Sequence, residues 1–162
     1  MPLVQANKYP YVYVIRDEAK QQAEAMYSGN EFVTSELISS YAWDTALNFI
    51  CQTNKEGYLL ATTTDTTYGN IGTDNRAQTG EYEADNYSNI HDLLGNCKEW
   101  TTEYSNGTTQ YGLGQPVVSA PFVARGGNNE LSGYAAADRL KDINSYMTYG
   151  SFRLQLYINP EN

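Results

Sequence analysis

Residues 92–103 read DLLGNCKEWTTE, and they indicate the fold more than any other stretch does. The Gly-Asn pair at 95–96 is a turn signal, and the residues that follow it have the composition of a strand. Asp92 and Glu99 are acids on either side of this turn, and Trp100 follows the second of them. Three interpretations fit this layout: a loop that enters a strand, a cradle for a metal ion, or the remains of a catalytic scaffold.

Composition and charge limit what the chain can be. Its 162 residues fit one domain over 1–162 with a sizeable core. The net charge of −9 is opposite to what a binder of nucleic-acid phosphates needs, so we expect no nucleic-acid partner. No apolar run of about 18 residues occurs, so we also expect no membrane insertion. The N-terminal stretch MPLVQANKYPYVYV lacks a basic region followed by an apolar core, which argues against a signal peptide there.

The first half of the chain carries the helical signals. Residues 16–28 place alanines and a methionine at helical spacing, with acids early, and Gly29 ends the pattern. Residues 39–52 give the clearer helix, with Ser39 or Ser40 as its cap. Its apolar stripe is predicted to face the core and consists of Trp43, Ala46, Leu47, Ile50 and Cys51.

The remaining segments predict short strands and one long irregular region. Residues 99–104 and 116–127 are rich in β-branched or aromatic residues, and residues 11–15, of the same composition, predict a short strand or an extended entry to the first helix. Residues 151–158 alternate so strictly that they predict one strand with a single apolar face. Residues 61–89 have no period and are rich in Thr, Asn, Asp and Gly. Helices first, a loop-heavy middle and strands last indicate an α+β fold.

Four motifs in this order resemble the formylglycine-generating enzyme (sulfatase-modifying factor) family. DLLGNCKEWTTE resembles its G-N-x-x-E-W motif, and VARGG at 123–127 resembles its R-G-G element. YGSFRLQL at 149–156 resembles its terminal G-F-R strand, with Ser151 inserted, and SELISSYAWDTALNFI resembles a helix of a bacterial branch. The resemblance implies a C-type-lectin-like fold with two helices, a small twisted antiparallel sheet and long loops. The extra N-terminal strand of the family is either absent or supplied by a longer parent.

The same resemblance argues against an enzyme. Catalytic members need a copper-binding cysteine pair between R-G-G and G-F-R, and residues 128–149 contain no cysteine. A related branch holds iron with three histidines, whereas this chain has only His91. We therefore expect neither copper nor iron, although a sulfatase-modifying type of oxidase remains the alternative. Cys51 and Cys97 lie in other motifs, and the sequence leaves open whether they are free thiols or a disulfide.

A ligand- or receptor-binding module is the function that remains. The resemblance places a Tyr/Asn-rich ligand face between the R-G-G and S-F-R elements, and tyrosine and asparagine are typical of adaptable binding surfaces. The rival interpretation is that these are ordinary turn residues. Arg139 and Arg153 resemble framework arginines that make buried hydrogen bonds. The predicted face consists of Asn128, Asn129, Glu130, Tyr134, Asp138, Asn144, Tyr146 and Tyr149.

The resemblance extends to retroelement-diversified receptor-binding proteins of phages and bacteria, which vary this same stretch. The implied partner is a protein or glycan receptor, carbohydrate binding by stacking on tyrosines being the rival within the binding class. The implied place is extracellular, on a cell surface or on a virion, where the domain can belong to a larger oligomeric assembly.

For the opening stretch, the family implies a calcium site. Carried over, its ligands are the Asp92 side chain, the Gly95 and Cys97 carbonyls, and Glu99. Hard oxygen donors from a loop suit Ca²⁺. The alternative is that Asp92 and Glu99 are structural residues that accept hydrogen bonds within the turn.

Overall fold

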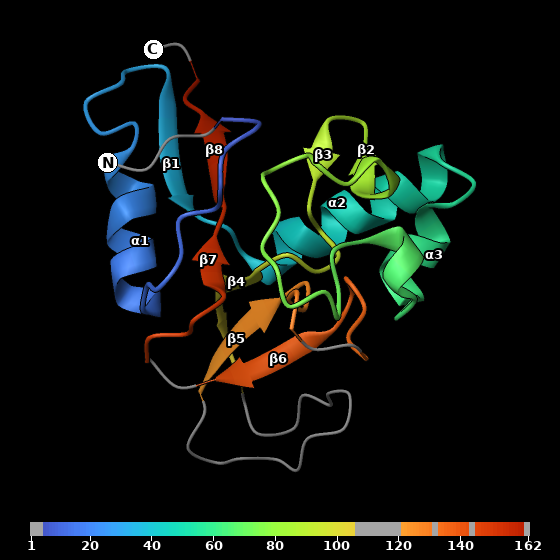
Figure 1. Cartoon of the computed structure of the whole chain (residues 1–162). Helices are drawn as coiled ribbons and strands as arrows, with labels where there is room; N and C mark the ends of the chain where they lie inside the picture. The colour runs from blue at the N-terminus through green and yellow to red at the C-terminus, as the bar shows by residue number, and fades with distance from the viewer. Residues whose placement is uncertain (1–4, 106–120, 131–132, 143–144, 161–162) are drawn as a thin grey trace.

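The computed structural model describes residues 5–105, 121–130, 133–142 and 145–160. Figure 1 shows α1 (Arg16–Ala25) beside a two-stranded ribbon of β1 (Val33–Leu37) and β8 (Leu154–Ile158). On the other side of the molecule lie α2 (Ser40–Thr53), α3 (Gly57–Thr62) and the small β2–β3 hairpin (Asn86–Tyr87, Ile90–His91). A four-stranded sheet joins these two groups, because one of its strands contacts α1, β1 and α2.

The two predicted helices are confirmed. In α1, Ala19 and Ala23 are buried, and in α2 the Ser39 hydroxyl accepts a hydrogen bond from the Ala42 N–H at 3.1 Å, which caps the helix. The third helix, α3, was not predicted. It has only 6 residues, which is too short to show a helical period. A Cβ at Gly57 would lie 2.5 Å from the Ile50 carbonyl oxygen, so α3 packs directly on the backbone of α2.

The central sheet has the order β6-β5-β4-β7. Strands β4 (Lys98–Tyr104), β5 (Phe122–Arg125) and β6 (Arg139–Asp142) pair antiparallel, whereas β7 (Gly150–Phe152) runs parallel to β4. The sheet is therefore mixed rather than purely antiparallel. Strand β6 also lies within the segment predicted as a ligand face, so part of that segment belongs to the framework.

The single strand predicted over 151–158 is wrong, because the chain divides it at Arg153. Strand β7 ends at Phe152 in the central sheet, and β8 starts at Leu154 in the ribbon with β1. The strict alternation consequently does not mark one buried face: Ile158 is 85% exposed. At Arg153 the chain passes from one sheet to the other, and the Arg153 side chain bonds to Glu99 there.

Residues 11–15 are not a strand either. Val14 is buried, and its carbonyl accepts a hydrogen bond from the Trp100 indole N–H at 2.9 Å. Tyr13 has a φ of 64°, in the left-handed region that a large side chain rarely adopts. Val14 is the one buried residue of this segment, and it packs in the cluster of Trp100.

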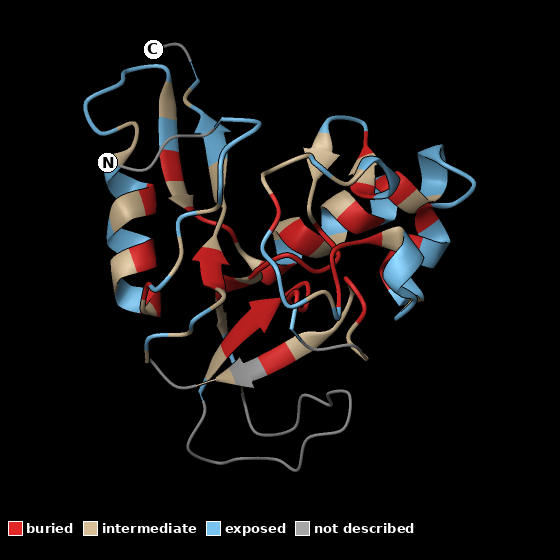
Figure 2. Ribbon diagram, in the orientation of Figure 1, coloured by how far each residue is buried: buried red, intermediate tan, exposed pale blue. Residues whose placement is uncertain are grey.

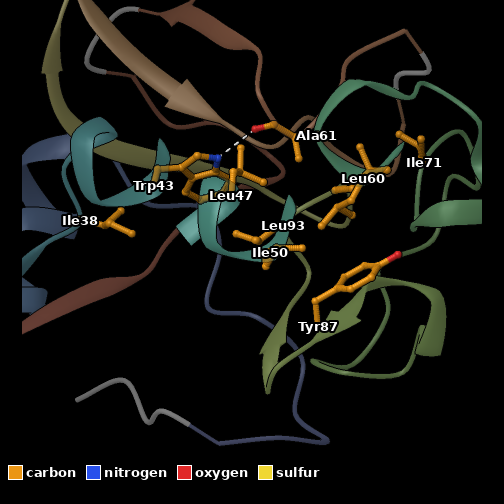
Figure 3. Close-up of a cluster of buried hydrophobic side chains, with 11 residues drawn as sticks. Ile38, Trp43, Leu47, Ile50, Leu60, Ala61, Ile71, Tyr87 and Leu93 are labelled. Atoms are coloured by element: carbon orange, nitrogen blue, oxygen red, sulfur yellow. Dashed lines mark hydrogen bonds between the residues drawn. The ribbon is translucent and has the colours of Figure 1, made fainter. Parts of the chain in front are cut away.

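Each of two hydrophobic clusters contains a buried tryptophan. Figure 2 shows the buried residues in red on the helices and on the strands. Trp43 packs with Leu47, Ile50, Leu60 and Leu93, and its indole N–H donates to the Ala136 carbonyl at 2.9 Å (Figure 3). The second cluster surrounds Trp100 and joins α1 to the central sheet; it contains Val14, Ala19, Ala23, Leu37 and Ala124. The predicted core role of Trp43 is confirmed, and Trp100 is buried as well.

Both cysteines carry free thiols, which decides between the two alternatives left open by the sequence. Among the described residues, no helix has the length and apolar character needed to cross a membrane.

Candidate functional site

Arg153 lies at the centre of the 92–99 turn. Its Nε and Nη2 both donate to the Glu99 carboxylate, the Nη2 bond measuring 2.7 Å. The same Nη2 donates to the carbonyls of His91 at 3.1 Å and of Asp92 at 3.3 Å. Burial alone would lower the pKa of Arg153, but the charges of Glu99 and its acidic neighbours outweigh burial and raise it. The turn is therefore arranged around a guanidinium cation.

The calcium ligands expected from the sequence take part in other contacts in this arrangement. Both oxygens of Glu99 are bound to Arg153, and the Gly95 carbonyl accepts the Cys97 N–H at 2.7 Å. The Asp92 carboxylate accepts a long hydrogen bond of 3.4 Å from the Asn96 amide. Among the residues that the structure describes, no group of three or more His, Cys, Asp or Glu side chains is placed to hold a metal ion. The calcium site stays a prediction, and the structural alternative for Asp92 and Glu99 agrees better with these contacts.

The loops beside the turn are held by asparagines. The Asn70 side-chain amide donates to the Asn96 side-chain oxygen at 3.1 Å, and that oxygen also accepts the Ala77 N–H at 3.0 Å. The Asn129 N–H donates to the Asn96 carbonyl at 3.2 Å, and the Asn129 carbonyl accepts the Thr73 N–H at 2.8 Å. Irregular backbone that is buried needs such partners, because an unpaired peptide group costs free energy.

This network corrects the prediction for two ligand-face residues. Asn128 and Asn129 were expected on an exposed surface, yet they are buried, and Asn129 has 0% exposure. Their polarity serves the interior of the loops. Sequence reasoning missed this role because a polar side chain in a turn-rich segment is usually exposed.

Three other predicted ligand-face residues, Glu130, Tyr146 and Tyr149, lie in two separate groups. Tyr149 and Glu130 share a hydrogen bond, which raises the pKa of the Tyr149 hydroxyl. Tyr146 is 58% exposed and instead approaches the N-terminal segment. Its hydroxyl donates to Glu18 at 3.1 Å, and its ring stacks on Tyr13 with centroids 6.2 Å apart. The structure thus brings Tyr149 together with Glu130 and places Tyr146 with residues that were not predicted.

Tyr134 and Asp138 are both half-buried. The Asp138 carboxylate accepts the Ala135 N–H at 2.8 Å, which is a local turn contact. A Cβ at Gly127 would lie 3.2 Å from the Tyr134 Cβ, so the R-G-G element packs against this tyrosine. Asn144, the last of the predicted set, lies outside the described residues.

A network of charged residues fixes the base of this segment. The Arg125 guanidinium is completely buried, and it donates to Asp44 at 2.6 Å and to the Asp138 carbonyl at 2.9 Å. Arg139 also pairs with Asp44 and bonds to Glu103 at 3.2 Å. Burial lowers the pKa of Arg125, while its bond to Asp44 acts in the opposite direction. The predicted framework role of Arg139 agrees with these contacts, whereas Asp44 was missed because it lies on the polar side of α2.

A cleft of about 370 Å³ opens between the N-terminal segment and the 89–99 loop. Tyr9 and Tyr11 of the N-terminal segment line it together with Asp92, Glu99 and Arg153. No local pattern in the sequence joins these two segments. The N-terminal segment is held at Thr79, through bonds from the Asn7 N–H to the Thr79 carbonyl and from the Thr79 N–H to the Lys8 carbonyl.

Comparison with known proteins supports the fold and does not assign a family. No family model matches the chain, and no curated protein matches it. Among solved structures, Treponema denticola variable protein 1 superposes with a TM-score of 0.64 over 98% of this chain and 75% of that chain, at 14% sequence identity. The domain therefore has the α+β, C-type-lectin-like fold of a variable protein. The resemblance to the formylglycine-generating enzyme family receives no support from a family match.

Proposed function

We propose that this domain is a non-enzymatic binding module for a receptor, with Glu130, Tyr146 and Tyr149 among its contact residues. One observation carries the proposal: Glu130 and Tyr146 are exposed and Tyr149 is half-buried, in a segment whose two ends the framework holds. At one end Arg125 is fixed by Asp44, and at the other Arg153 is fixed by Glu99. A rigid frame that presents tyrosines is suited to binding, because tyrosine offers a large contact area at a low entropic cost.

The chemistry of the remaining residues supports a non-enzymatic role. Burial raises the pKa of the Cys97 thiol to about 12, so a reactive thiolate does not form there at neutral pH. The side chain of His91 is half-buried, and its Nδ1 has no hydrogen-bond partner among the described residues. A histidine without an orienting carboxylate is a poor general base.

The fold shared with a variable protein favours a receptor-binding protein whose contact residues differ between copies. In this proposal the framework arginines keep the fold while the exposed positions change. Surface positions of this kind tolerate substitution, each usually changing stability within about 0.5 kcal/mol.

An array of glycans and purified cell-surface proteins tests the proposal with three forms of the domain. The wild type is compared with the double variant Tyr146→Ala/Tyr149→Ala and with the control Tyr58→Ala, which removes a tyrosine that is 66% exposed on α3. We expect the double variant to lose at least about tenfold in affinity for every array hit, and the control to lose less than about twofold. Equal binding by all three forms would overturn the assignment of the face, and the class of the hits decides between protein and glycan.

A further inference from the structure

Tyr13, in the N-terminal segment, has a backbone conformation that its own side chain disfavours. Its φ of 64° lies in the left-handed region, where a bulky side chain crowds the backbone. Glycines aside, the other described residues with a positive φ are asparagines, aspartates and one serine, so Tyr13 is the only aromatic residue among them. Asparagine or glycine would adopt the same conformation at a lower cost. The backbone therefore does not account for a tyrosine at this position.

Contacts on both sides of Tyr13 impose this conformation. Before it, the Tyr11 carbonyl accepts a hydrogen bond from the Ser151 hydroxyl at 2.8 Å. After it, the Val14 carbonyl accepts the Trp100 indole N–H at 2.9 Å, and the Val14 side chain is completely buried. Backbone strain persists where the surrounding structure over-determines it, and such positions cluster at functional sites. The strain at Tyr13 thus suggests a role for its side chain outside the fold.

The Tyr13 side chain lies at the surface and belongs to neither of the two core clusters. It is 62% exposed, and its ring stacks on Tyr146 with centroids 6.2 Å apart and planes 25° from parallel. Tyr146 is itself 58% exposed, and its hydroxyl donates to the Glu18 carboxylate at 3.1 Å. The N-terminal segment and α1 therefore hold two exposed rings side by side, and one of the two belongs to the proposed receptor face.

We propose that Tyr13 is a contact residue for a protein receptor and that it extends the receptor face from Tyr146 onto the N-terminal segment. This role rests on the receptor-binding function proposed above. Two tyrosines in a fixed arrangement offer a large contact area, and little side-chain freedom is lost when they bind.

The stacked arrangement favours a protein over a glycan. Each ring of the pair has given one face to the other ring, whereas a sugar stacks on an open aromatic face. A protein surface also contacts tyrosine through the ring edge and the hydroxyl, and tyrosine is enriched at the residues that contribute most to protein interfaces.

The purified cell-surface proteins of the array test this contact with variants of the whole chain. Tyr13→Asn removes the ring and introduces a residue that tolerates the positive φ. We expect it to lose at least about tenfold in affinity for the protein hits. The matched control Tyr9→Ala removes a tyrosine that is 63% exposed in the same segment and should lose less than about twofold. Equal losses for the two variants, or a loss below about threefold for Tyr13→Asn, would overturn the assignment.

The Tyr146→Ala background separates a receptor contact from a positioning role. If Tyr13 touches the receptor, Tyr13→Asn should weaken binding further in that background. If Tyr13 only holds the Tyr146 ring in place, the second substitution should have no effect there, and Tyr13 would not be a contact residue.

Urea unfolding adds a measurement that needs no receptor. Because Tyr13→Asn relieves the strained conformation, its unfolding midpoint should equal or exceed that of the wild type even though the stack is lost. A clearly lower midpoint would show that the ring serves the fold, which would overturn its assignment to the receptor face.

The same array distinguishes failure of this contact from failure of the proposed function. If Tyr146→Ala/Tyr149→Ala loses binding and Tyr13→Asn does not, the receptor-binding function stands and the role of Tyr13 is wrong. If only glycans bind the wild type, the protein receptor is wrong. If nothing on the array binds the wild type, the proposed function fails, and the role of Tyr13 fails with it.

Discussion

Replacing Arg153 with alanine is expected to be among the most destabilising single changes in the domain. The substitution removes two donors from the Glu99 carboxylate and one shared donor from the His91 and Asp92 carbonyls. The side chain of Glu99 is only 10% exposed, so its charge cannot be returned to water without local rearrangement. Burial already raises the pKa of Glu99, and the guanidinium is what opposes this effect.

The size of the loss follows from this burial. Breaking a buried ion pair by removing one partner costs about 3–5 kcal/mol. Because the Arg153 side chain is 24% exposed, we expect the lower end of that range, about 3 kcal/mol. A single domain is stable by about 5–15 kcal/mol, so the variant should remain folded but unfold at a clearly lower urea concentration.

Urea unfolding followed by tryptophan fluorescence measures this directly, since Trp43 and Trp100 are both buried. The control is Lys20→Ala, which breaks an exposed i,i+4 pair of 3.7 Å with Glu24 and should cost less than about 0.5 kcal/mol. The double variant Arg153→Met/Glu99→Leu should be more stable than Arg153→Ala, because no unpaired charge is left. A loss below about 1 kcal/mol for Arg153→Ala would refute the reasoning.

The same experiment decides the calcium prediction. In the wild type the guanidinium occupies the Glu99 oxygens, so millimolar calcium should leave the unfolding curve unchanged. In Arg153→Ala the freed carboxylate and carbonyl oxygens are suitable calcium ligands, and calcium should restore part of the lost stability. Calcium-dependent stabilisation of the wild type would instead support the site expected from the sequence.

Three further predictions concern burial, packing and activity. Burial raises the pKa of Asp85 well above its ordinary value of 3.8. The free energy of unfolding of the wild type, relative to that of Asp85→Asn, should therefore increase as the pH falls from 7 towards 4. If the unfolding free energies of the two proteins in urea change in parallel across this range, the prediction is contradicted. Trp43→Phe removes the donor to the Ala136 carbonyl and should cost about 2–3 kcal/mol in the same assay, an effect under about 0.5 kcal/mol being inconsistent with the packing described. Incubation with a sulfatase-motif peptide and copper should give no mass change by mass spectrometry, whereas conversion of the peptide cysteine would show that the domain is an enzyme.

Regular elements with a clear apolar period were predictable from the sequence. The stripe that contains Trp43 predicted α2 and its inward face, and the run around Trp100 predicted β4. Helix α2 buries one side against the core, which is the condition under which periodicity carries information, whereas β4 buries Glu99, Trp100 and Thr101 in succession and was predictable from its composition.

The predictions that were wrong concern features that depend on contacts between distant segments. The break between β7 and β8 lies at Arg153, which bonds to Glu99, and the buried Asn129 bonds to Asn96 and Thr73. The predicted face was divided for the same reason, because Tyr146 stacks on Tyr13. None of these partners is a sequence neighbour, so no local pattern could identify them.

A display library measures the central claim, that a fixed framework presents a changeable binding face. Each of Glu130, Tyr146 and Tyr149 is randomised, alongside the framework positions Arg125 and Arg153, and cells are sorted first for folded display and then for binding to a receptor found on the array. The account predicts that most face variants display as well as the wild type while losing or changing binding, and that most framework variants fail to display. If the face positions tolerate substitution no better than the framework, or if their variants keep wild-type binding, the claim is contradicted.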